Sequence, residues 1–307
     1  MVLSVIICTH NPRPDYLRRV LEALKAQTLP GEQWELLLID NASKESLAGK
    51  WDLSWHPHSR TIREEKLGLT AARLRGMQES KAGVLVFADD DNVLFEDYLL
   101  ECFKIAEKWT TIGAWGGQQF PEFEGGEPAE AWKREFWTST LKRDVWSNNY
   151  DAAAVPIGAG ICIRREVALK YADLVNRDPI RLRLGRKGSN LNAAEDFDMA
   201  FTACDMGLGI GRFCSLKLHH LMPAGRINDD YLLRLNEGFG YSQVVLGALR
   251  GNIVSLPSRI DRLVNFYKRL RIPPMKRRMD IAYEAGTKRA VTELQQSSTN
   301  DTPSVSR

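Results

Sequence analysis

The sequence predicts an α/β protein with a mostly parallel central sheet flanked by helices. Apolar runs of strand length alternate with helix-like segments over the first 120 residues, as strands buried on both faces do. The 307 residues are 44% hydrophobic and 26% charged, which is ordinary for a globular chain with a sizeable core. Because such sheets bind ligands at the carboxyl ends of their strands, functional residues are expected there.

The elements follow one another in a regular order. Three apolar runs, each ending at a polar residue, predict strands over 3–8, 34–39 and 83–88. Apolar residues at helical spacing predict helices over 15–24, 69–79 and 95–106. Further along, the patterns predict strands over 155–163 and 214–218 and helices over 194–206 and 229–249. Between these two halves, residues 120–150 are expected to form a long loop that could contain a short helix.

This order predicts three parts of the chain. The first is an α/β domain over 1–250, with one half at about 1–118 and the other at about 119–250. A basic helical C-terminal extension follows over 251–293. Residues 294–307 are polar and are expected to form a disordered tail.

Composition and missing motifs exclude several classes of protein. A net charge of +3 is too small to indicate nucleic-acid binding, and no apolar run is long enough to cross a membrane. The N-terminus lacks the features of a signal peptide, and the five dispersed cysteines favour thiols in a reducing cytoplasm. There is no P-loop, no complete GxGxxG and no GxSxG, so P-loop, dinucleotide and serine-hydrolase sites are disfavoured.

The strongest local signal is the acidic run Asp89, Asp90 and Asp91 after a buried strand. Three adjacent carboxylates repel one another, and a hard divalent cation bridging to a diphosphate would relieve that repulsion. The alternative is a polar turn that caps the following helix. Asp40 also ends a predicted strand, where it could accept the ring N–H of a base or instead form a local Asx turn.

Two further groups could carry chemistry. Glu195 and Asp196 begin a predicted helix, where Asp196 could serve as a general base or the pair could simply cap the helix. The neighbouring His219 and His220 follow a strand-like run, and one imidazole could bind Mn²⁺. Adjacent histidines usually point in different directions, so at most one is an expected ligand.

Taken in order, these motifs resemble the family 2 glycosyltransferases of the GT-A fold. The resemblance spans about residues 3–245 and lies in SVIICTHNPRPDYLRRVLEALKAQT, WELLLIDNAS, KLGLTAARLRGM, VLVFADDDN, PIGAGICIRREV, LGRKGSNLNAAEDFDMAFTACDMG and LHHLMPAGRI. Two positions depart from the family pattern. Leu74 stands where Asn often follows the Ala-Arg pair, and Ala194 stands where Gly often precedes Glu-Asp.

The resemblance implies a role for each motif. The residues that would bind the nucleotide-sugar donor are Thr9, Asp40, Arg73, Asp89 and Asp90. Asp91 and His220, with His219 as the rival, would hold Mn²⁺ or Mg²⁺, and Asp196 would be the catalytic base. The acceptor side would include Gly158, Trp132, Trp137 and Glu195. Each tryptophan could stack on a sugar or could instead pack its segment onto the sheet.

The implied reaction inverts the anomeric carbon of a nucleotide-diphosphate sugar, with a UDP-sugar expected. The acceptor would be a hydroxyl of a saccharide or a lipid-linked molecule, as in bacterial-type polysaccharide or glycoconjugate synthesis. The competing hypotheses are a sugar nucleotidyltransferase and a non-catalytic nucleotide- or carbohydrate-binding module. The basic segment 258–289 could add peripheral contact with the inner face of a membrane, or it could be a helix that packs on the catalytic domain with a solvated basic face.

Overall fold

The computed structural model describes all residues except 129–138, 187–190, 253–255, 257 and 301–307. The chain forms two compact units. The first unit contains Met1–Arg177 and Glu195–Ala224, and the second contains Asp178–Ala194 and Gly225–Arg307. Helix α7 (Asp229–Ala248), which lies inside the predicted domain over 1–250, groups with the C-terminal helices.

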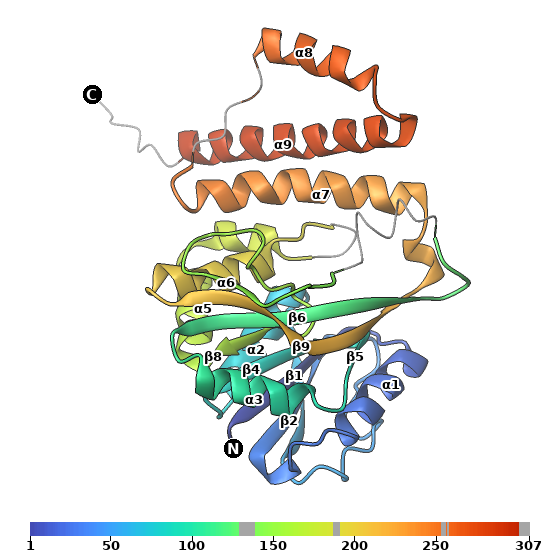
Figure 1. Ribbon diagram of the computed structural model, residues 1–307, viewed down its shortest axis with the longest axis vertical. Helices are drawn as coiled ribbons and strands as arrows, with labels where there is room; N and C mark the ends of the chain where they lie inside the picture. The colour runs from blue at the N-terminus through green and yellow to red at the C-terminus, as the bar shows by residue number, and fades with distance from the viewer. Residues whose placement is uncertain (129–138, 187–190, 253–255, 257, 301–307) are drawn as a thin grey trace. The chain divides into compact units, whose positions relative to one another are not determined.

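The first unit is a mixed sheet flanked by helices, which confirms the predicted α/β class (Figure 1). The order of its strands is β3-β2-β1-β4-β8-β6-β9-β5, and β7 pairs with β9. The strands are β1 (Leu3–Thr9), β2 (Trp34–Asn41), β3 (Ser59–Glu64), β4 (Val84–Asp89), β5 (Asn92–Leu94), β6 (Ile112–Phe123), β7 (Val145–Ser147), β8 (Cys162–Arg164) and β9 (Gly209–Met222). Its helices are α1 (Pro14–Lys25), η1 (Gly31–Gln33), α2 (Leu69–Glu79), α3 (Tyr98–Lys108), α5 (Arg165–Arg177) and α6 (Glu195–Asp205). The short helix η3 (Ala224–Arg226) begins at the last residue of this unit and continues into the second.

The parallel part of the sheet agrees with the apolar runs in the sequence. Every residue of β1 and β2 is buried, and β1 pairs in parallel with both β2 and β4. Helix α2 lies very close to this layer because Gly76 has no side chain: a Cβ there would stand 2.5 Å from a methyl carbon of Ile6. Beyond β4 the sheet becomes mixed, since β8 runs antiparallel to both β4 and β6.

The structure differs from the expected loop over 120–150 and from the expected strand over 155–163. Strand β6 continues to Phe123, and β7 lies within the same segment. Several residues of these strands are partly exposed. Their sequences therefore lack the continuous apolar run that marks a strand buried on both faces. The segment before β8 is irregular, because Gly160 takes a positive φ of 73° and a Cβ there would stand 2.5 Å from the hydroxyl of Tyr98.

The second unit is helical and contains η2 (Pro179–Leu184), α7, α8 (Arg259–Arg269) and α9 (Pro274–Asn300). Helices α7 and α9 pack with their backbones close together. A Cβ at Gly240 would lie 2.1 Å from the carbonyl oxygen of Tyr283, and one at Gly286 would lie 1.9 Å from that of Glu237. The predicted C-terminal helical extension is confirmed, and glycines on both helices make its tight packing possible.

Helix α9 continues through Asn300, into the segment 294–307 that is expected to form a tail. Once a helix exists, each added residue gains a hydrogen bond without the cost of nucleation, so a polar run can extend it. The remainder of the tail, residues 301–307, lies outside the described part of the chain. Among the described residues, no helix is both long enough and apolar enough to cross a bilayer.

Candidate active site

The carboxyl ends of β1, β2 and β4 lie side by side and form one edge of the candidate site. Thr9 is the register partner of Asp40, and Cys8 is the partner of Asp89. The hydroxyl of Thr9, at the end of β1, also donates a hydrogen bond to Asp90, the residue that follows β4. The structure therefore brings Thr9 and the acidic run together, as the strand order predicts.

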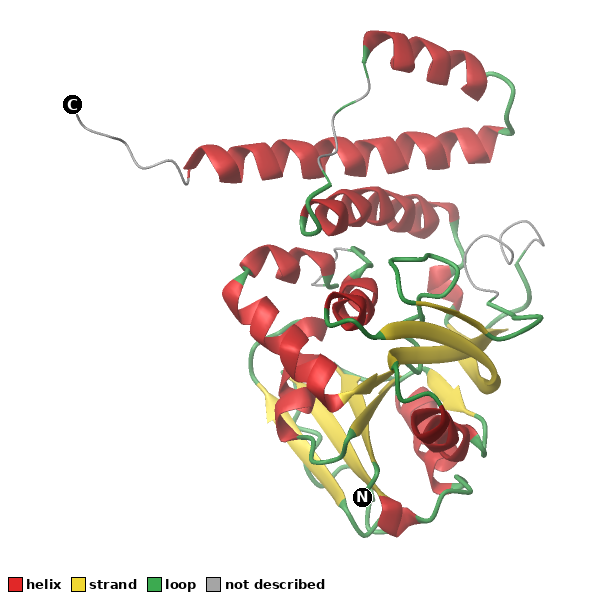
Figure 2. Ribbon diagram, turned by 60° about the vertical axis from the view of Figure 1, so that its left-hand side comes forward, coloured by secondary structure: helices red, strands yellow, loops and turns green. Residues whose placement is uncertain are grey.

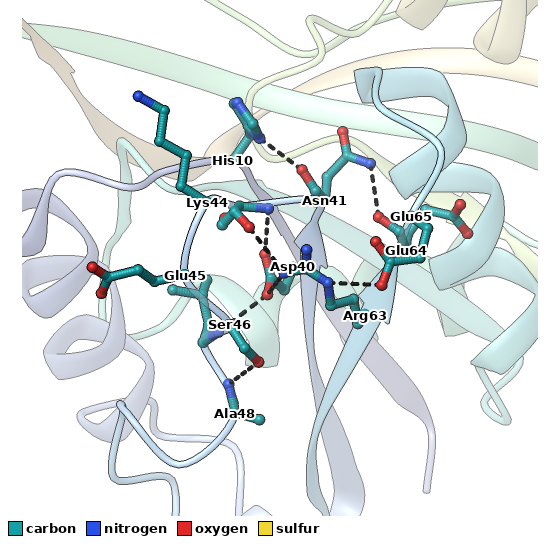
Figure 3. A network of polar contacts seen from close by, with 12 residues as sticks. His10, Asp40, Asn41, Lys44, Glu45, Ser46, Ala48, Arg63, Glu64 and Glu65 are labelled. Atoms are coloured by element: carbon teal, nitrogen blue, oxygen red, sulfur yellow. Dashed lines mark hydrogen bonds and ion pairs between the residues drawn. The ribbon is translucent and has the colours of Figure 1, made fainter.

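Asp40 is almost completely buried, with 1% of its surface exposed. Its carboxylate accepts hydrogen bonds from the backbone N–H groups of Ser43 and Leu47, each at 3.1 Å, and from Arg63 at 2.8 Å (Figure 3). Burial raises the pKa of Asp40, but these hydrogen bonds outweigh that effect and hold the pKa below its ordinary value. Asp40 thus stabilises the loop after β2, and its contact with a base stays a prediction.

The loops after β1 and β2 are tied to each other. The side-chain oxygen of Asn11 accepts a hydrogen bond from the backbone N–H of Lys44 at 2.9 Å. The backbone N–H of Asn11 donates a hydrogen bond to the hydroxyl of Ser43, also at 2.9 Å. The ring of His10 contacts the carbonyl oxygen of Asn41 at 2.7 Å (Figure 3). Asn11 and Ala42 have positive φ angles of 48° and 52°, which Asn tolerates better than Ala. The cross-links hold both residues in this conformation.

Arg73 lies behind the acidic edge and joins three elements. Its side chain is 4% exposed, and its guanidinium reaches Asp89 on β4 at 3.5 Å and Glu195 on α6 at 3.7 Å. Burial lowers the pKa of Arg73, but attraction to Glu195 and Asp89 more than offsets this, so the pKa is raised. Arg73 is therefore a buried cation that balances carboxylates from both halves of the site. Its direct contact with a nucleotide stays a prediction.

Glu195 faces Arg73 rather than solvent. Its two carboxylate oxygens are buried, and its only close cation among the described residues is Arg73. Burial raises the pKa of Glu195, and the positive charge of Arg73 opposes that rise. The carboxylate of Glu195 thus partly balances the charge of the buried Arg73 guanidinium. Its expected contact with the acceptor stays a prediction.

Asp196 occupies the first turn of α6 and is held by backbone N–H groups. Gly158 donates to one carboxylate oxygen at 2.7 Å, and Phe197 donates to the other at 3.0 Å. A Cβ at Gly158 would stand 3.1 Å from Asp196 and 3.4 Å from Arg73, so a glycine lets this backbone approach both groups. Unlike Glu195, Asp196 is only half-buried, so one of the two acids can still meet a substrate.

The pairing of β5 with β9 distinguishes the two histidines. His220 is opposite Asn92, and its Nε2 lies 3.5 Å from the carboxylate of Asp91. His219 points to the other face, where its ring stacks on Phe95 with centroids 5.0 Å apart and planes at 19°. The geometry therefore favours His220 as the partner of Asp91.

The metal prediction is not decided by these contacts. No group of three or more His, Cys, Asp or Glu side chains within the described ranges is arranged to hold a metal ion by itself.

The predicted acceptor residues Trp132 and Trp137 lie outside the described residues. Sequence reasoning missed Arg63, because it belongs to the partly exposed strand β3, which has no apolar run to reveal it.

Three comparisons place this chain among known proteins. The model of the family described as "Glycosyl transferase family 2" matches residues 4–172. Glycosyltransferase AglE of Haloferax volcanii is 25% identical over 150 residues, which are 48% of this chain and 49% of AglE. The chain thus spans about half the length of that curated relative.

Solved structures of S. aureus TarS share the fold. The structure of TarS 1–349 with UDP-GlcNAc has a TM-score of 0.55 and 15% identity, over 97% of this chain and 92% of TarS 1–349. The same fragment with UDP has a TM-score of 0.51 and 12% identity over the same shares. Because the family model matches more than half of the sequence, the chain belongs to glycosyl transferase family 2.

Proposed function

We propose that the protein is an inverting glycosyltransferase that uses a nucleotide-diphosphate sugar. The observation that carries this proposal is the position of Arg73, which contacts Asp89 at the strand edge and Glu195 at the start of α6. The donor-side acids and the candidate base Asp196 are thereby brought to one site. A binding module has little need of a half-buried carboxylate held by Gly158, whereas a transferase needs a base there.

A UDP-sugar is the proposed donor. Membership of family 2 supports a nucleotide-sugar donor, and the TarS structures are complexes of that protein with UDP-GlcNAc and UDP. In this chain, Thr9 and Asp90 form a hydrogen-bonded pair at the edge of the sheet, where α/β proteins bind ligands. We propose that Thr9, Asp89 and Asp90 contact the nucleotide portion of the donor.

Asp91 and His220 suit Mn²⁺ or Mg²⁺ as two members of a larger ligand set. The Nε2 atom of His220 and a carboxylate oxygen of Asp91 are 3.5 Å apart, so both can point at one ion. Asn92 donates to the other carboxylate oxygen of Asp91 at 2.9 Å and so orients it. When bound, the ion would supply positive charge that stabilises the departing diphosphate.

Asp196 is the proposed general base. It accepts the proton of the acceptor hydroxyl while that oxygen forms a bond to the anomeric carbon and the bond to the diphosphate breaks. The two N–H groups that hold Asp196 orient its carboxylate before the acceptor binds. Attack opposite the leaving group inverts the anomeric configuration.

The proposed acceptor is a hydroxyl of a saccharide or of a lipid-linked molecule, in the synthesis of a polysaccharide or glycoconjugate. A lipid-linked acceptor would require the enzyme to work beside a membrane. The basic segment 258–289 could provide peripheral contact with the inner face of that membrane.

The first experiment measures the melting temperature with UDP, GDP and dTDP, each with and without Mn²⁺. A ligand at about 100 times its Kd adds about 2.7 kcal/mol to the stability of the native state. We expect UDP to raise the melting temperature with Mn²⁺ and expect Asp91→Ala to abolish the shift. The control Asp173→Ala removes an exposed acid from α5 and should leave the shift intact.

Each outcome has a separate meaning. A shift with GDP or dTDP alone would keep the enzyme class and change the donor, while no shift with any nucleotide would contradict the donor site. A turnover assay with donor and acceptor completes the test. Release of pyrophosphate would favour a nucleotidyltransferase, and binding without turnover would favour a binding module.

A further inference from the structure

Helix α8 exposes most of its large apolar side chains. Between 43% and 73% of the surface of each is exposed, and they are Ile260, Leu263, Val264, Phe266, Tyr267 and Leu270, the last just after the helix. Residues 260, 263, 264 and 267 follow the spacing that places side chains on one helical face. A helix of a globular protein normally turns such a face toward the core.

The side-chain polar contacts described for α8 are those of Arg269, and they are made with α9. Figures 1 and 2 show α9 between α7 and α8. Arg269 of α8 forms an ion pair with Glu284 at 2.8 Å and donates to the carbonyl oxygen of Asp280 at 3.3 Å. Only 19% of the side chain of Arg269 is exposed. The helix is thus attached to α9 through a charged side chain, while its large apolar side chains are exposed.

The charge of the segment indicates what covers the apolar residues. Residues 258–289 contain ten Lys or Arg and three Asp or Glu, a net charge of +7 in a chain whose total is +3. The rest of the chain is therefore acidic. Two copies of this segment would repel each other, whereas an anionic surface would attract it. Apolar side chains beside a basic cluster are the features of a helix that lies in a membrane interface.

We propose that α8 binds the surface of an anionic lipid bilayer. Leu263, Phe266 and Tyr267 enter the boundary between headgroups and acyl chains, and Arg271 beside them meets anionic headgroups. This contact would hold the enzyme near a lipid-linked acceptor, and that consequence alone rests on the proposed function.

The test measures co-sedimentation of the full chain with two kinds of vesicle. One contains phosphatidylcholine alone, and the other also contains phosphatidylglycerol. We expect binding to the anionic vesicles that weakens as salt is added. Leu263→Ser/Phe266→Ser should reduce the affinity by about a hundredfold, because each side chain buries apolar surface in the interface. Arg271→Gln should reduce it about fivefold.

Trp146→Ser is the matched control, because Trp146 is exposed to the same 57% as Phe266 but lies on β7 of the other unit. It should bind vesicles like the parent protein. Far-ultraviolet circular dichroism and the UDP-induced melting shift show whether each variant is folded and keeps its donor site. They also separate failure of this proposal from failure of the proposed function.

The proposal is overturned if the parent protein does not co-sediment with anionic vesicles, or if the double variant binds them as tightly as the parent protein does. Equal binding to both kinds of vesicle would contradict the role of charge. A dimer in light scattering that the double variant loses, without vesicle binding by the parent, would assign the apolar face to a second copy instead.

Discussion

The strand edge of the first unit and helix α8 of the second depart from ordinary burial in opposite directions. At the strand edge, charged side chains are buried: Arg73 is 3% exposed and Asp40 is 1% exposed. On α8, apolar side chains are exposed, as Phe266 at 57% illustrates. Both arrangements cost free energy in water unless another group compensates.

The strand edge and helix α8 differ in which groups offset this free-energy cost. The buried charges have partners within the protein, because Arg73 meets two carboxylates and Asp40 accepts three hydrogen bonds. The apolar residues of α8 have no such cover among the residues that the structure describes. Buried charge here indicates a rigid, preorganised site, and exposed apolar surface indicates a partner outside the chain.

The largest effect is expected at the one acid of the pair that is open to solvent. Asp196→Asn should lower turnover by about 10²–10⁴-fold, because the amide cannot accept the acceptor's proton. UDP binding, measured by the melting shift, should persist. Asp205→Asn at the other end of α6 is the control and should keep its turnover. Full turnover in Asp196→Asn would refute its role as the base.

The buried ion pair should carry the next largest effect. Arg73→Met leaves Glu195 buried beside no cation and should lower the free energy of unfolding by about 3–5 kcal/mol. Adding Glu195→Gln removes that stranded charge, so the double variant should recover part of the loss. Urea denaturation compares the parent protein, Arg73→Met, Glu195→Gln and the double variant. If the double variant were less stable by the sum of the single losses, the two charges would not be coupled.

Asp40→Asn should cost about 1–3 kcal/mol at neutral pH, since an amide cannot accept all three hydrogen bonds. The folded pKa of Asp40 lies below its unfolded value of about 3.9. Its ionised form therefore stabilises the fold above that unfolded value, and this contribution is lost as the pH falls through the folded pKa. The difference between parent and variant should shrink accordingly in acid.

Denaturation of both proteins across this acidic range measures the effect. The control Asp52→Asn changes an exposed turn acid that lacks such burial, and it should have a smaller effect. Loss of UDP binding without loss of stability would instead support direct contact between Asp40 and the base.

The smallest effect is expected on α8, where Phe266→Ser should change the free energy of unfolding by no more than about 0.5 kcal/mol. The same change at Phe87, which is 1% exposed on β4, should cost at least about 3 kcal/mol. Thermal or urea unfolding compares the two variants. A large loss at Phe266 would mean that its ring is covered within the protein, and the comparison of the two regions would fail.

The predictions from sequence succeeded where a local pattern and the tertiary environment agree. The expected helix over 69–79 matches α2, and the first three apolar runs are β1, β2 and β4 within two residues at their ends. They failed for β3 and β6, which are partly exposed, because an apolar run appears only where both faces of a strand are covered. Helix α9 extends beyond Leu294 for a different reason, since elongation of an existing helix needs no apolar pattern.

The sequence predicted which residues belong to the site but not which of them contact one another. The family motifs singled out Asp40, Arg73 and Glu195 as binding residues, yet the structure buries all three. Their burial depends on neighbours far apart in sequence, such as Arg63 for Asp40 and Arg73 for Glu195. Spacing along the chain cannot reveal these partners, because each pair meets only when separate strands and helices pack.

The sequence by itself determined the α/β class, the family and the acids at the strand ends, because these depend on local periodicity and on motif order. Only the tertiary structure decided that His220 rather than His219 faces Asp91, since strand pairing sets which face each side chain takes. It also decided that α8 turns its apolar side outward, because a helical pattern defines a face without defining what that face meets.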